Sequence, residues 1–67
     1  MSHFQKVFIE NESKQHELAA AAEKAAKEAG YQITVKQDGS FFYRNEESYN
    51  NQEKIYSAVN EAIAQVI

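Results

Sequence analysis

The chain has 67 residues, a formal net charge of −3 from seven Lys or Arg and ten Asp or Glu, and neither cysteine nor proline. This length predicts one domain over residues 1–67, which buries only about 60% of the surface that the unfolded chain exposes. The lack of cysteine excludes disulfides and thiolate metal sites. The mild acidity argues against a dedicated nucleic-acid binder, whose affinity usually rests on many Lys and Arg contacts to phosphate.

The start of the chain lacks the basic segment and continuous apolar run of a signal peptide, and no apolar run approaches membrane-spanning length. A cysteine-free composition also fits a reducing compartment. We therefore expect a cytoplasmic protein with no membrane partner.

The first expected element is a strand over His3–Glu10, because its side chains follow the alternation of a strand. Asn11 or Ser13 is then expected to be the N-cap of a helix. Alternation along the strand places Val7 and Ile9 on one side and Phe4, Lys6 and Phe8 on the other.

A helix is expected over about Lys14–Ala29, where alanine gives a high helix propensity. Gly30 stands where a left-handed residue commonly ends a helix. Glu23 and Lys27 have the spacing of an exposed ion pair. The predicted buried stripe comprises Leu18, Ala21, Ala22, Ala25 and Ala29.

Two β-prone runs, Tyr31–Lys36 and Ser40–Arg44, flank Asp38-Gly39, a dipeptide suited to a two-residue type I′ turn. Such a turn makes Val35 face Phe42, and facing residues share one side of the sheet. One side then carries Ile33, Val35 and Phe42, and the other carries Thr34, Lys36, Phe41 and Tyr43. Both sides of the predicted sheet therefore hold large apolar groups.

Residues 45–51 form a polar connection in which Glu46 and Glu47, with Glu53 beyond it, make an acidic rim suited to a basic surface on a partner. Asn50 and Glu53 resemble a capping box, so the last helix is expected to begin there and run to the C-terminus. Its predicted buried stripe comprises Ile55, Val59, Ala62, Ile63 and Val66.

The resulting order, β-α-β-β-α, predicts an α+β fold in the form of a two-layer sandwich. A right-handed crossover makes the first two strands parallel, and the third strand runs antiparallel to the second. The sheet is therefore expected to be three-stranded and mixed, with both helices on one face.

Helices on one face would leave the aromatic rings of the other face uncovered. A small monomer rarely exposes a large apolar patch unless the patch binds something. We therefore expect a non-enzymatic protein–protein interaction module, either a homodimer or a stoichiometric regulator or inhibitor of a larger protein. The predicted partner-binding residues are Phe4, Lys6, Phe8, Lys36, Phe41 and Tyr43. A different strand register would instead turn some of these rings inward.

The same aromatic face suggests an alternative, the binding of single-stranded nucleic acid, because rings flanked by lysines form stacking platforms in some RNA-binding folds. Only Lys6, Lys36 and Arg44 would lie near it, however, and the Gly-aromatic signature of such modules is missing. Protein binding is therefore the preferred hypothesis.

Catalytic and metal-binding patterns are also missing from the sequence. His3 and His16 have no ligand partner at helical spacing, no Gly-rich loop occurs for phosphate, and no serine has a nucleophile setting. We expect no enzyme activity, no cofactor and no metal site.

Overall fold

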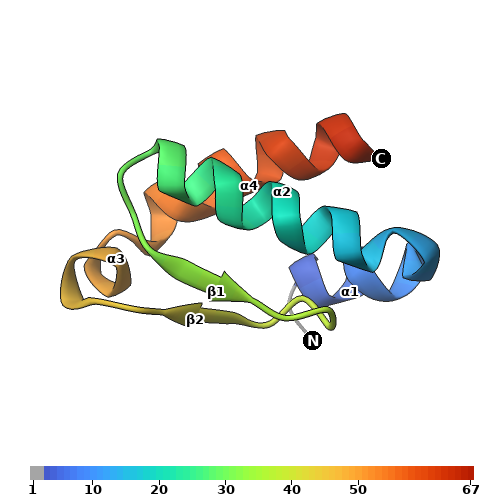
Figure 1. Ribbon diagram of the computed structural model, residues 1–67, viewed down its shortest axis with the longest axis horizontal. Helices are drawn as coiled ribbons and strands as arrows, with labels where there is room; N and C mark the ends of the chain where they lie inside the picture. The colour runs from blue at the N-terminus through green and yellow to red at the C-terminus, as the bar shows by residue number, and fades with distance from the viewer. Residues whose placement is uncertain (1–2) are drawn as a thin grey trace.

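The structure is a computed structural model that describes residues 3–67. Within them the chain forms four α-helices, one short 3-10 helix and a two-stranded antiparallel sheet, so the predicted three-stranded sandwich is wrong. Figure 1 shows the elements in order: α1 (His3–Glu10), η1 (Glu12–Lys14), α2 (Gln15–Glu28), β1 (Ile33–Val35), β2 (Phe41–Tyr43), α3 (Glu46–Asn50) and α4 (Gln52–Val66).

The segment predicted as the first strand is helix α1. Phe4, Val7 and Phe8 are spaced i, i+3 and i+4, so a helix puts all three on one face, whereas a strand would separate Val7 from the two rings. In the structure Phe4 and Phe8 are buried, and Val7 packs against the same core. Ile9 lies 54% exposed on the other side. The helix is favoured because it packs Val7 against the core together with both rings.

Asn11 closes α1 instead of capping the next helix. Its side-chain Nδ2 donates to the Val7 carbonyl at 2.9 Å, and its backbone N–H donates to the same oxygen at 3.1 Å. Neither Asn11 at η1 nor Lys14 at α2 makes a side-chain cap hydrogen bond. The predicted N-cap is therefore wrong, because the Asn11 side chain is hydrogen-bonded to the Val7 carbonyl at the end of α1 and does not cap the next helix.

Helices α2 and α4 lie side by side above the hairpin and form the main packed layer (Figure 1). Gly30, with φ of +94°, ends α2 as predicted: its N–H donates to the Lys27 carbonyl and the Tyr31 N–H to the Ala26 carbonyl, the Schellman pattern. The predicted α2 stripe is rotated, since Ala29 is exposed. The buried side chains of the two helices are Leu18, Ala19, Ala22 and Ala26 of α2 and Ile55, Val59 and Ile63 of α4.

The hairpin loop contains residues 37–39, one more than predicted. Its Gly39 N–H donates to the Lys36 carbonyl at 3.0 Å, and Gly39 has φ of +89°. A tight turn followed by a left-handed glycine is the usual three-residue hairpin. The strands pair Ile33 with Tyr43, Thr34 with Phe42 and Val35 with Phe41. The predicted register is wrong by one residue, and such a slip moves every side chain of a strand to the opposite face.

Two hydrogen bonds of Ser48 hold helix α3 at the end of the hairpin. The Asn45 side chain caps α3 by accepting from the Ser48 N–H at 2.8 Å. The Ser48 hydroxyl is buried and accepts from the Gln32 N–H at 2.8 Å, which ties α3 to the residue just before β1. The expected capping box at Asn50 is not formed, because α4 begins after Asn51 without a side-chain cap. No helix within residues 3–67 is long and apolar enough to cross a membrane.

Candidate functional site

The six predicted partner-binding residues do not form one exposed face. Phe4 and Phe8 belong to the core, and Phe41 and Tyr43 lie half-buried against it. The two lysines are exposed in different places: Lys6 pairs with Glu10 on α1, Nζ to Oε1 4.0 Å, and Lys36 follows β1. The prediction of an uncovered aromatic sheet face is therefore wrong, because the observed register turns the Phe41 and Tyr43 side chains toward the helices. The stacking platform required by the nucleic-acid alternative is lost with it.

The structure does bring four aromatic side chains together along the hairpin, and we call them the aromatic margin: Phe41, Tyr43, Tyr49 and Tyr56. The Phe41 ring centre lies 5.8 Å from that of Tyr56. The buried Phe4 ring contacts both, with its centre 4.9 Å from that of Phe41 and 5.1 Å from that of Tyr56. Tyr43 meets Tyr49 edge-on at 5.8 Å. Tyr49 and Tyr56 are 60% and 39% exposed, so solvent reaches the outer part of this margin.

Sequence reasoning missed Tyr49 and Tyr56 as site residues. Tyr49 is the one bulky residue in the polar connection after β2, and a lone aromatic residue in a polar segment could have indicated a site residue. Tyr56 lies beside the buried stripe of α4, on the side of the helix that meets Phe41. Only the packing of α3 and α4 against the hairpin shows that the two rings share a surface.

The Tyr43 hydroxyl is buried and has no hydrogen-bond partner among the described residues. Burial raises the pKa of Tyr43 above its ordinary value, and the neighbouring Tyr56 raises it further. Burial disfavours the charged phenolate, so the inner end of the aromatic margin favours the neutral phenol of Tyr43.

The outer edge of β2 has no neighbouring strand, because the sheet within residues 3–67 has the order β1-β2 (Figure 1). Hydrogen bonds join Lys36 N–H to the Ser40 carbonyl at 2.9 Å and Arg44 N–H to the Gln32 carbonyl at 3.0 Å. In an antiparallel pair these positions alternate with residues whose backbone groups point outward. The backbone N–H and C=O groups of Phe41 and Tyr43 therefore point away from β1.

Phe42 projects from the outer face of the hairpin, opposite to the core. Its side chain is 50% exposed, and Lys36 Nζ lies 4.9 Å from the centre of its ring. Thr34, its partner across the strands, is also exposed. The open edge of β2 therefore has an exposed aromatic ring on its outer face, Phe42, and the aromatic margin on its inner face.

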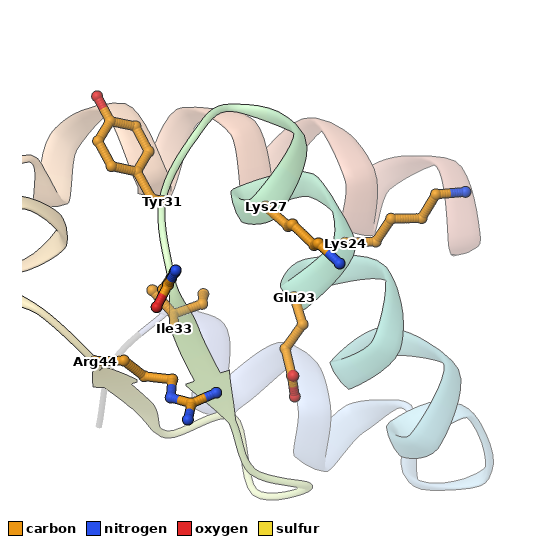
Figure 2. Close-up of a pocket in the computed structure, with 7 residues that line it drawn as sticks. Glu23, Lys24, Lys27, Tyr31, Ile33 and Arg44 are labelled. Atoms are coloured by element: carbon orange, nitrogen blue, oxygen red, sulfur yellow. The ribbon is translucent and has the colours of Figure 1, made fainter.

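A hollow of about 540 Å³ lies on the other side of the hairpin, between α2 and the free edge of β1 (Figure 2). The residues that line it are Glu23, Lys24, Lys27, Tyr31, Gln32, Ile33 and Arg44. We call it the basic groove. The predicted Glu23–Lys27 ion pair is not formed: Glu23 Oε2 instead accepts from the Val35 N–H at 3.2 Å. The single ion pair in the described part of the chain is Lys6–Glu10, so the cations of the groove have no acidic partner.

The described residues contain no group of three or more His, Cys, Asp or Glu side chains that could hold a metal ion. The chain matches none of the protein-family models searched, and no curated protein or solved structure matches it significantly. The inference of function therefore rests on the open edge of β2, the aromatic margin and the basic groove.

Proposed function

We propose that this chain is a protein-binding module that pairs with a second copy of itself through the open edge of β2. The main support for this proposal is the edge itself. The backbone N–H and C=O groups of Phe41 and Tyr43 point away from β1, and the Phe42 side chain between them is exposed. Exposed apolar strand edges tend to pair with another chain, and natural proteins usually protect them with charges, proline or bulges. None of these devices occurs in Phe41–Tyr43.

The edge is self-complementary about a two-fold axis through Phe42. In antiparallel pairing centred there, Phe41 of one copy faces Tyr43 of the other, and each such pair exchanges two backbone hydrogen bonds. The two Phe42 residues form the non-hydrogen-bonded pair at the centre, where side chains approach most closely. The two hairpins would then form one continuous four-stranded sheet.

Backbone pairing of three residues buries little apolar area, and the aromatic rings along this edge would add to it. An aromatic cross-strand pair contributes roughly 0.2–1 kcal/mol relative to alanine. Tyr49 and Tyr56 lie on the inner side of the same edge, and tyrosine is enriched at interfaces because it buries a large ring while keeping a polar tip. Charged residues are absent from the three strand positions, so the pairing brings no like charges directly opposite one another in the strands. The cytoplasmic location expected from the cysteine-free sequence stays part of this proposal.

Charge reversal at Phe42 tests the pairing, because this side chain lies outside the core. Phe42→Glu and Phe42→Lys each place like charges directly opposite one another at the two-fold axis, which is destabilising. We expect the wild-type chain to sediment as a dimer and each variant to sediment as a monomer with unchanged circular dichroism. An equimolar mixture of the two variants should dimerise, since Glu then faces Lys.

The matched control is Thr34→Glu, which adds a charge to the same outer face on β1, away from the dimer axis. Its sedimentation should remain that of a dimer. A wild-type chain that stays monomeric at millimolar concentration contradicts the proposal. So does a Thr34→Glu variant that dissociates as fully as Phe42→Glu.

A further inference from the structure

The basic groove lies on the edge of the hairpin opposite to β2, and its composition differs from that of the aromatic margin. We infer that the groove binds an extended acidic peptide segment, which adds as a strand to the free edge of β1. Strand addition of this kind takes its affinity from backbone hydrogen bonds and its specificity from the side chains around the edge. The inference does not depend on dimerisation, because it uses the other edge.

The backbone of β1 offers the hydrogen bonds that a strand needs. Gln32 and Lys36 are bonded to β2, so the N–H and C=O groups of Ile33 and Val35 point toward the groove. The Val35 N–H already binds an acceptor there, the Glu23 carboxylate at 3.2 Å. That carboxylate occupies the position that a neighbouring strand would fill with a carbonyl. Ile33 is therefore the residue at which an incoming strand pairs, and Glu23 marks where the pairing ends.

The charges beside Ile33 select an acidic strand. Figure 2 shows the guanidinium of Arg44 in front of β1 and the Lys27 ammonium on the α2 side, while the Lys24 ammonium points away from β1. Side chains of an extended peptide alternate between the two faces of a sheet. Acidic side chains on one face would meet Lys27, and those on the other would meet Arg44. Neither cation has an ion-pair partner among the residues that the structure describes.

The shape of the groove favours a peptide over a compact anion or a nucleic acid. A phosphate group is bound by donors that converge on one point, whereas Arg44 shares the outer face of the hairpin with Phe42 and Lys27 belongs to α2, which packs on the core face. Nucleic-acid affinity requires many Lys and Arg contacts to phosphate, and the groove is lined by three cations, Lys24, Lys27 and Arg44. Tyr31 adds apolar surface along the groove, which suits the aliphatic side chains of an extended segment.

The test is fluorescence anisotropy with three dye-labelled, end-blocked peptides added to the full chain. The first alternates glutamate with valine, the second has glutamine in place of glutamate, and the third keeps its glutamates but carries a central proline. We expect the first to bind and the other two to bind at least about tenfold more weakly, since one loses the charges and the other a backbone donor. Equal binding of the glutamine or the proline peptide would overturn the inference. Displacement of the first peptide by an oligonucleotide at the same low concentration would overturn it as well.

Variants of the groove locate the site. Lys27→Glu and Arg44→Glu should each weaken binding of the glutamate peptide about tenfold, whereas Lys54→Glu on α4 changes the net charge equally and should leave it unchanged. Glu23→Gln keeps an acceptor for the Val35 N–H but removes a negative charge, so it should strengthen binding. The Ile33 amide should show the largest NMR shift on titration. Equal weakening by Lys54→Glu, or an Ile33 amide that does not move, contradicts the proposed site.

Discussion

Gly30 and Gly39 both have positive φ, at +94° and +89°, but their surroundings differ. A side chain at Gly30 would point into open space. A Cβ at Gly39 would lie 2.8 Å from the Cα of Gln5 and 2.9 Å from the carbonyl oxygen of Phe4. Gly39 therefore serves both the hairpin turn and the close approach of α1, so one residue couples the two elements.

This difference predicts unequal costs for two identical substitutions. Gly30→Ala should lower the free energy of unfolding by about 1 kcal/mol, the cost of a left-handed conformation in a residue with Cβ. Gly39→Ala should lower it by about 2–4 kcal/mol, because the clash with the α1 backbone adds an overpacking cost. Urea denaturation of the two variants measures both values. Equal losses of unfolding free energy would show that the backbone of α1 does not pack closely against Gly39.

At the scale of elements, the length of a periodic pattern decides what the sequence can predict. The stripes of α2 and α4 run for several turns, so both helices and the buried Ile55, Val59 and Ile63 were predicted correctly. The eight residues of α1 span two turns, and their spacing fits strand alternation about as well as a helix. Only tertiary packing, which places Val7 against the core beside Phe4 and Phe8, decides between them.

The hairpin shows a second limit at the same scale. Asp38-Gly39 correctly indicated a turn between two strands, but the turn residues alone do not distinguish a two-residue from a three-residue loop. The added residue reverses the faces of β2, so Phe41 and Tyr43 were placed on the wrong side of the sheet. The free edges of β1 and β2, which carry both proposals, follow from the sheet having two strands instead of three.

The helical assignment of α1 predicts a sharp contrast between neighbouring side chains. Phe8 is 0% exposed, so Phe8→Ala should lower the free energy of unfolding by about 3–5 kcal/mol through lost burial and the cavity left behind. Ile9→Ala should cost less than about 1 kcal/mol, because its side chain is half in water. Chemical denaturation compares the two. A loss for Ile9→Ala as large as that for Phe8→Ala would contradict the orientation of α1.

The whole molecule has a small core for its length. The large apolar side chains that are fully buried are those of Phe8, Leu18, Ile55 and Val59 among the described residues, and much of α2 packs through alanine. Alanine lets α2 and α4 approach closely but buries little area per residue. A chain of this size commonly needs an added source of stability, such as oligomerisation, when disulfides and metals are missing. Pairing at β2 would supply it.

A dimer that is needed for stability makes the unfolding temperature depend on protein concentration, since association favours the folded state by mass action. Each tenfold increase in concentration should add about 1.4 kcal/mol to the unfolding free energy of the dimer and raise the midpoint by a few degrees. The Phe42→Glu chain should instead unfold at a lower temperature that stays constant with concentration. Differential scanning calorimetry over a hundredfold concentration range checks both chains. Parallel, concentration-independent midpoints would mean that the small core is sufficient alone and that the open edge of β2 does not contribute to stability through a second copy.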